Sequence, residues 1–176
     1  MKKKNWFKYI IAFLSVFAFR LIPFRAPNVE PIMAVLMPFG KTYGKLYAFL
    51  FGSLSIVFFD LITSGLGIWT LITALTYGFL GIGAQYFFKN RSGWKNYALY
   101  SFVAIILYDA ITGLTVGPLM YGTPFIVALV GQIPFTALHL LGGVSFAIVL
   151  SPSIERWVKV KESSSVVNIK NSVLVN

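Results

Sequence analysis

Four ionisable side chains stand within otherwise apolar stretches of this chain: Glu30, Asp60, Asp109 and His139, the only histidine. A carboxylate beside an imidazole can act as an acid–base pair, and charged groups around a cavity can hold a polar ligand. An ionisable group is costly in an apolar environment, so it usually faces a cavity or a partner of opposite charge. The four residues therefore indicate a functional site, if the fold brings them together.

The composition identifies the kind of fold that must position these groups. Hydrophobic residues make up 57% of the 176-residue chain and charged residues only 11%, whereas a soluble domain carries about a quarter charged residues. A chain this apolar could not cover its own surface in water, so we expect an all-α, polytopic membrane bundle. The absence of cysteine excludes disulfides, thiolate metal ligands and a cysteine nucleophile.

Six apolar segments are candidates for membrane-spanning helices, each of which needs about 20 mostly apolar residues. We expect these helices at residues 6–24, 28–39, 44–62, 66–88, 97–115 and 133–150. The second segment is short, since twelve residues reach only about 18 Å in a helix. The external segment 117–132 is expected to be a re-entrant or interfacial turn.

The basic residues favour one orientation of these spans. If all six segments cross, every one of the 15 lysines and arginines except Arg20 and Arg25 lies on one side of the membrane. The positive-inside rule makes that side the cytoplasm, so both termini are expected there. The second span would then cross by tilting or by thinning the bilayer. The transmembrane domain is expected to cover residues 1–151, and a cytoplasmic tail, residues 152–176, to carry a solvated Glu155.

On this map the polar residues inside the spans gather toward the outer face, where a proline-rich loop, residues 20–32, joins the first two spans. Trp69 and Thr73 lie one helical turn apart on one face of the fourth span, and Tyr77 follows one turn deeper. We predict one shared cavity under the loop, with these substrate-binding residues: Arg20, Arg25, Asn28, Glu30, Asp60, Trp69, Thr73, Tyr108, Asp109, Gln132 and His139.

A purely structural interpretation of the same residues stays open. Arg20 could reach lipid headgroups at the membrane surface. Asp109 and His139 could form a hydrogen bond between helices and do nothing more. Independent structural pairs need not share one depth and one side of the membrane, which favours the cavity.

Nucleotide, metal and nucleic-acid sites are not indicated. Residues 40–42 read Gly-Lys-Thr, but Val35 stands where a phosphate-binding loop needs its first glycine. With a single histidine and no His-Glu-x-x-His pattern we expect no metal site and no cofactor. Nothing in the charge pattern calls for a nucleic-acid partner.

The order of these features resembles the substrate-binding S component of energy-coupling factor (ECF) vitamin transporters. The resemblance rests on FRLIPFRAPNVEPI at 19–32, GKTYGKLYAFLFGSLSIVFFD at 40–60 and GQIPFTALHLLGG at 131–143, and with the spans it covers residues 6–151. It implies a protein that is not an enzyme. Such a protein binds a vitamin or a precursor from outside the cell membrane and delivers it with a membrane T component and two ATPase subunits.

The resemblance also implies a contact between the first helix and the T component. The family often carries Ala-x-x-x-Ala there, whereas here Ala12 is followed by Val16. Small side chains at Ala12, Ser15 and Ala18 are the candidates for this contact. Two other classes remain open: a polytopic membrane enzyme that uses Asp109 and His139, and a structural membrane protein without a ligand.

Overall fold

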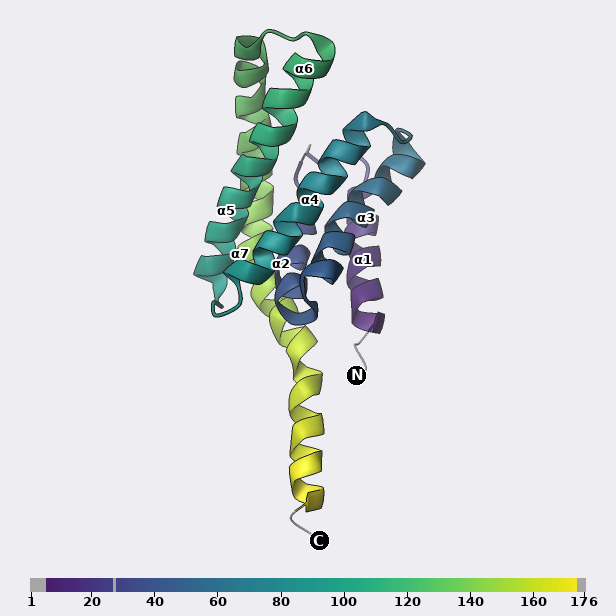
Figure 1. Ribbon diagram of the computed structural model, residues 1–176, viewed down its shortest axis with the longest axis vertical. Coiled ribbons are helices and arrows are strands. Elements are labelled where there is room, and N and C mark those ends of the chain that lie inside the picture. The colour runs from purple at the N-terminus through teal and green to yellow at the C-terminus, as the bar shows by residue number, and fades with distance from the viewer. Residues whose placement is uncertain (1–5, 27, 174–176) are drawn as a thin grey trace.

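The computed structural model describes residues 6–26 and 28–173, with side chains described up to residue 159. Within that part of the chain every regular element is helical, as predicted, and Figure 1 shows the arrangement. A π-helical turn (Thr112–Val116) continues α5 into α6. The α-helices are α1 (Trp6–Arg20), α2 (Ile32–Tyr43), α3 (Lys45–Thr63), α4 (Ile68–Phe87), α5 (Trp94–Ile111), α6 (Gly117–Tyr121) and α7 (Phe125–Val173).

Four helical stretches are long and apolar enough to cross a membrane: Lys45–Thr63, Ile68–Phe87, Trp94–Tyr121 and Phe125–Lys159. Many large apolar side chains on their outer faces are exposed, Phe79 and Leu141 among them, and a bilayer would cover these surfaces. By length and composition the chain is therefore a multi-pass membrane protein. α1 and α2 are shorter, with 15 and 12 residues, and the crossing of all six predicted spans stays a prediction.

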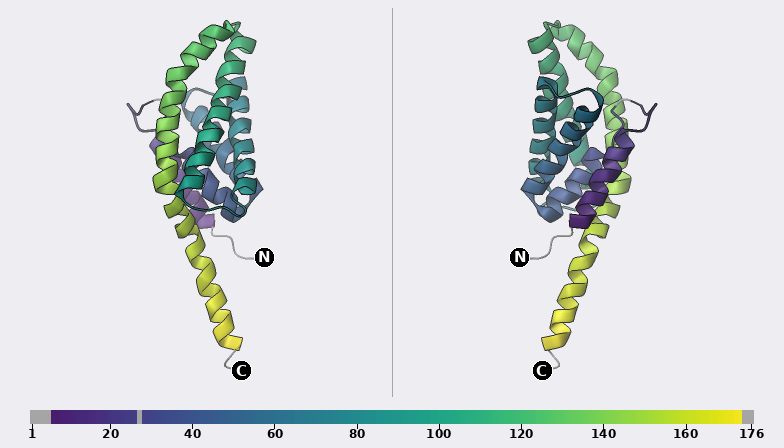
Figure 2. Two further views of the ribbon diagram at one scale, coloured as in Figure 1. Left: turned by 90° about the vertical axis from the view of Figure 1, so that its left-hand side faces the viewer. Right: turned by 90° about the vertical axis from the view of Figure 1, so that its right-hand side faces the viewer.

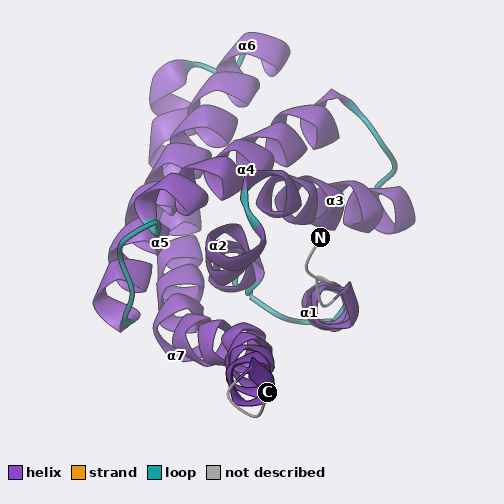
Figure 3. Ribbon diagram, turned by 60° about the horizontal axis from the view of Figure 1, so that its bottom comes forward, coloured by secondary structure: helices purple, strands orange, loops and turns teal. Residues whose placement is uncertain are grey.

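The short helix α2 lies in the centre of the bundle. Every residue from Ile32 to Gly40 is buried, and α2 packs against α3, α4, α5 and α7 (Figure 3). Protein therefore surrounds α2, so its 12 residues need not match the thickness of a bilayer. This arrangement removes the reason for expecting a thinned membrane around it.

Helices α3 and α4 form a tight pair because glycines lie along their contact. A side chain at Gly52 would place its Cβ 2.7 Å from the carbonyl oxygen of Tyr77, and one at Gly81 would place it 2.6 Å from that of Ala48. Small residues allow helix backbones to approach this closely. The pair fixes the position of the cavity-lining residues that both helices carry.

The predicted separate turn at residues 117–132 is wrong. The π-helical turn (Thr112–Val116) and α6 extend α5, the chain reverses at Gly122 in a left-handed conformation (φ 65°), and α7 begins at Phe125. Pro134 lies inside α7 and does not end it. The segment is thus the tip of a helical hairpin, and α7 continues past residue 151 to Val173.

Both termini lie at the same end of the bundle (Figures 1 and 2), together with the α2–α3 connection and the α4–α5 loop. Glu155 of α7 is buried there, so the prediction of a solvated Glu155 is wrong. Its carboxylate lies 2.6 Å from Lys41 Nζ and 2.5 Å from Lys159 Nζ, and Tyr97 donates to it at 2.9 Å. Ser92 of the α4–α5 loop also donates to Glu155 and accepts a hydrogen bond from Lys41. We call these five residues the terminal-end cluster.

Candidate functional site

A cavity of about 310 Å³ lies toward the opposite half of the bundle, between the α1–α2 loop and helices α3, α4, α5 and α7. All the predicted substrate-binding residues line it except Asp109 and Gln132. The lining residues are Arg20, Arg25, Asn28, Glu30, Ile56, Phe59, Asp60, Trp69, Thr73, Tyr108, Phe135 and His139. The structure therefore brings these residues to one cavity, while their role in binding stays a prediction.

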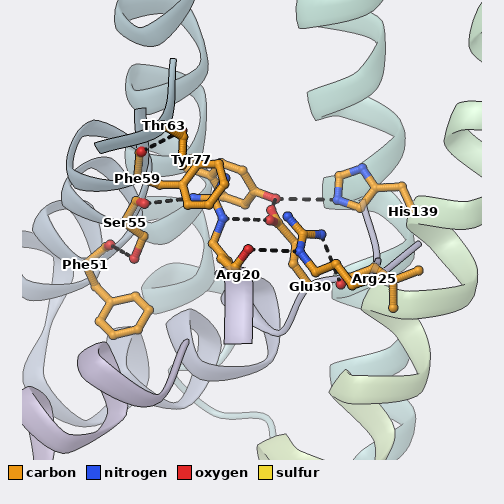
Figure 4. Close-up of polar contacts among 10 residues, drawn as sticks. Arg20, Arg25, Glu30, Phe51, Ser55, Phe59, Thr63, Tyr77 and His139 are labelled. Atoms are coloured by element: carbon orange, nitrogen blue, oxygen red, sulfur yellow. Dashed lines mark hydrogen bonds and ion pairs between the residues drawn. The ribbon is translucent and has the colours of Figure 1, made fainter. Parts of the chain in front are cut away.

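Arg20, the last residue of α1, fastens the α1–α2 loop to α3. Its Nε lies 3.0 Å from Glu30 Oε2, and its Nη1 donates to the Ser55 carbonyl oxygen at 2.7 Å. The guanidinium also lies over the Phe59 ring, 4.0 Å from its centroid (Figure 4). Arg20 and Glu30 are both buried, so Arg20 does not reach out to lipid headgroups.

Two residues of the α1–α2 loop have an unusual backbone conformation. Phe24 and Asn28 have left-handed backbone conformations, with φ of 63° and 62°, which asparagine tolerates better than most residues do. Asn28 Nδ2 is buried without a hydrogen-bond partner. Arg25 lies between the two positions, and its guanidinium donates to the backbone carbonyl oxygens of Arg20 and Val29.

A chain of buried polar contacts crosses the bundle beneath the loop. The Tyr77 hydroxyl donates to Glu30 Oε1 at 2.8 Å and lies 3.4 Å from His139 Nε2 (Figure 4). On its other side His139 Nδ1 lies 2.9 Å from Asp109 Oδ1. A hydrogen on Nδ1 lets His139 donate to Asp109, and the role of Nε2 toward the Tyr77 hydroxyl depends on the tautomer of the ring. Together with the Arg20–Glu30 pair, these contacts link α1, α4, α5 and α7.

Asp60, near the end of α3, forms a separate acidic point on the cavity wall. Its Oδ2 accepts a hydrogen bond from the Thr70 hydroxyl at 2.7 Å, and the residue is 8% exposed. Thr70 belongs to the first turn of α4, where the backbone N–H groups of the helix favour a negative charge. No cation of the described chain lies within ion-pair distance of Asp60.

Aromatic side chains form the rest of the wall. The centroid of the Tyr108 ring lies 4.5 Å from that of the Tyr77 ring. It lies 5.5 Å from that of the His139 ring, which meets it edge-on. Trp69 is half-exposed at the start of α4, and Phe135 contributes from α7. A flat ligand could lie on these rings while its polar atoms meet the charged groups.

Two predicted residues do not line the cavity. Asp109 is 1% exposed and reaches the cavity only through His139. Gln132 packs against Gly113 in the π-helical turn and donates to the Thr136 hydroxyl. Along α7, Gln132 lies about 10 Å from His139, since seven residues of helix separate them.

Sequence reasoning missed several residues that shape the site. Tyr77 shares a helix face with Trp69 and Thr73, and that periodicity was the available signal for it. Phe59, Ile56 and Phe135 carry no such signal, because apolar residues do not stand out in an apolar chain.

The three small residues predicted to contact a T component differ in their surroundings. Ala12 is buried in the core, whereas Ser15 and Ala18 are exposed. Ala12 and Ser15 border an apolar groove of about 300 Å³ between α1 and α7, and Phe19 packs on Phe146 there. Only Ser15 and Ala18 are therefore open to a partner helix.

Within the described residues no three histidine, cysteine, aspartate or glutamate side chains converge as metal ligands would. Asp109 and His139 form a pair without a third such group. Comparison with family models, with curated proteins and with solved structures finds no match for this chain, so the chemistry of the cavity is the basis on which a function can be assigned.

Proposed function

We propose that this chain is the membrane-embedded substrate-binding subunit of an ECF-type uptake transporter for a vitamin or another micronutrient. In this role it captures a small polar or heterocyclic ligand from outside the cell membrane. A separate module, made of a T component and ATPase subunits, then drives delivery.

The observation that carries the proposal is the cavity under the α1–α2 loop. Charged groups from the loop, α3 and α7 converge there with aromatic rings from α4 and α5, a combination typical of small-molecule sites. Purely structural ion pairs would not need to enclose about 310 Å³ of space.

The loop fits the role of a cover over the ligand. Within the described residues its side chains meet α1 through the Arg20–Glu30 ion pair and the Arg25 hydrogen bond to the Arg20 carbonyl oxygen, and Glu30 also accepts the Tyr77 hydrogen bond. A ligand that competes for Glu30 or Arg20 could therefore loosen the loop, and a ligand that adds contacts could hold it shut.

The orientation follows from charge. The end that carries both termini also carries Lys41, Lys45 and Lys159, and basic ends face the cytoplasm. The cavity then lies nearer the outer face of the membrane. Energy must come from a partner, since the chain has no phosphate-binding loop.

Mass spectrometry of small molecules released from the purified chain tests the proposal. We expect one small polar molecule in near-equal amount to the wild-type protein, and its loss from the Glu30→Gln variant. Protein that carries no such molecule after expression in rich medium, or that hydrolyses ATP alone, contradicts the proposal.

The Asp109–His139 pair supports a second candidate, a membrane enzyme. A carboxylate 2.9 Å from an imidazole nitrogen is the arrangement that orients a general base. The other ring nitrogen, however, faces Tyr77 at 3.4 Å. Conversion of the bound molecule by the isolated chain would favour this candidate over transport.

A further inference from the structure

The charged groups around the cavity fall into two classes, those paired within the chain and those left over. Arg20 pairs with Glu30 at 3.0 Å, and His139 pairs with Asp109 at 2.9 Å. Both pairs are buried, and each is neutral when its two members are ionised. A ligand gains little by competing with either pair, because a buried charge that loses its partner is strongly destabilising.

Asp60 is the acidic group left over. No cation of the described chain lies within ion-pair distance of it, and its one side-chain partner is the neutral Thr70 hydroxyl. A carboxylate has about four acceptor positions, so Asp60 can accept further hydrogen bonds. It lines the cavity while being more than nine-tenths buried, so a donor inside the cavity is its natural partner.

Arg25 is the basic group left over. Its guanidinium lines the cavity and donates only to the backbone carbonyl oxygens of Arg20, at 3.2 Å, and of Val29, at 3.4 Å. No carboxylate within the described range is in ion-pair contact with it. Arginine has five N–H donors in a planar fork that matches a carboxylate or phosphate, so most of its capacity is free for an anionic group.

We infer that the cavity takes a small zwitterion, whose anionic group binds Arg25 and whose protonated amine or ring N–H binds Asp60. This inference rests on the proposed function, because it names the substrate class of the same site. A ligand with one charge would satisfy one of the two residues and leave the other without a counter-charge.

The size of the cavity further limits the class of ligand. About 310 Å³ is the lower end of ordinary ligand sites and holds roughly ten water molecules. An amino acid or a single aromatic ring with two charged substituents fits this space, whereas a large macrocyclic vitamin does not. Trp69 at the rim offers a face for such a ring.

Three probes with the same phenyl ring test the inference: L-phenylalanine, phenethylamine and 3-phenylpropionate. The first carries both charges, the second only the positive one and the third only the negative one. Binding to the full chain in lipid nanodiscs is measured by calorimetry at pH 7. We expect phenylalanine to bind at least tenfold more tightly than either singly charged probe, since a hydrogen bond to a charged group contributes about that factor or more.

Two variants that each remove one charge, and a control, locate the effect. Asp60→Asn should weaken phenylalanine and phenethylamine binding but not that of 3-phenylpropionate, and Arg25→Gln should show the reverse selectivity for the two singly charged probes. Lys45→Gln, at the opposite end of the molecule, should change none of them. Equal or tighter binding of a singly charged probe, or no binding of any probe, overturns the inference.

The outcome separates this inference from the proposed function. If an uncharged or singly charged molecule co-purifies with the wild type and is lost from cavity variants, the zwitterion class is wrong and the proposed function stands. If no molecule co-purifies and no probe binds, both are wrong.

Discussion

Two buried polar clusters lie in this apolar bundle, one around the cavity and one at the end that carries the termini. At the terminal-end cluster Glu155 meets two lysines and two hydroxyl groups, and these partners surround its carboxylate. Around the cavity, Asp60 and Arg25 have no ion partner among the described residues, and they lie beside about 310 Å³ of space. The first arrangement is complete within the described chain and ties helices together, whereas we propose that a ligand completes the second.

The largest expected contrast is the accessibility of the two ends. The chain has no native cysteine, so Lys45→Cys and Ser64→Cys each introduce a single thiol, on opposite ends of α3. In intact cells a membrane-impermeant thiol reagent should label Ser64→Cys and leave Lys45→Cys unlabelled, because the proposed orientation places the basic end in the cytoplasm. Labelling of Lys45→Cys in intact cells contradicts the orientation, and labelling of both variants in lysed cells is the control.

Removing the charge at the terminal-end cluster should cost stability and leave binding intact. Glu155→Gln leaves Lys41, which is 12% exposed, without its carboxylate. Breaking a buried ion pair costs about 3–5 kcal/mol of unfolding free energy. Thermal unfolding in detergent measures this loss. Unchanged stability, or a loss of ligand affinity as large as that of a cavity variant, would remove the distinction between the clusters.

Adding a methyl group at the α3–α4 contact should disturb both clusters moderately, because it displaces the two helices that carry cavity-lining residues. Gly81→Ala places a Cβ against the Ala48 backbone and should cost about 1–3 kcal/mol of stability. Gly67→Ala is the matched control, because no atom lies within 4 Å of its added Cβ. Equal melting temperatures for the two variants would show that the contact is looser than the structure has it.

The smallest expected effect on stability comes from the polar chain under the loop. Tyr77→Phe removes the hydrogen bond to Glu30 and keeps the ring against Tyr108. The expected loss is about 1.5 kcal/mol of unfolding free energy, since the acceptor is charged and keeps its Arg20 partner, while ligand affinity should fall because the α1–α2 loop is held less firmly. Thermal unfolding and calorimetry on the same sample separate the two effects. If Tyr77→Phe keeps full ligand affinity, the position of the α1–α2 loop does not depend on the Tyr77 hydrogen bond.

The cavity could be predicted from sequence because its key residues are chemical exceptions. Asp60 and His139 are ionisable groups in apolar helices, Glu30 lies in the loop just before one, and the order of the helices puts the three at one depth. The face formed by Trp69, Thr73 and Tyr77 added the spacing of a helix. These signals can be recognised in the sequence without knowing how the helices pack.

Other features depend on packing that the pattern does not encode. Helices that are apolar all round do not reveal which face meets protein and which meets lipid, so the central place of α2 was not predicted. The burial of Glu155 depends on Lys41 and Tyr97 arriving from other helices. The extension of α7 to Phe125 depends on Pro134 being tolerated within a helix, which sequence alone does not decide.

The central claim is that the cavity cluster serves a ligand and the terminal-end cluster serves the fold. Ligand affinity and thermal stability, measured together on alanine variants of Arg25, Glu30, Trp69, Asp109 and His139 and on Glu155→Gln, test it most directly. We predict a loss of affinity of about ten- to a hundredfold for the variants at true ligand contacts, with unchanged affinity and lower stability for Glu155→Gln. Unchanged affinity in all five of these alanine variants with falling stability would contradict the claim and make both clusters structural.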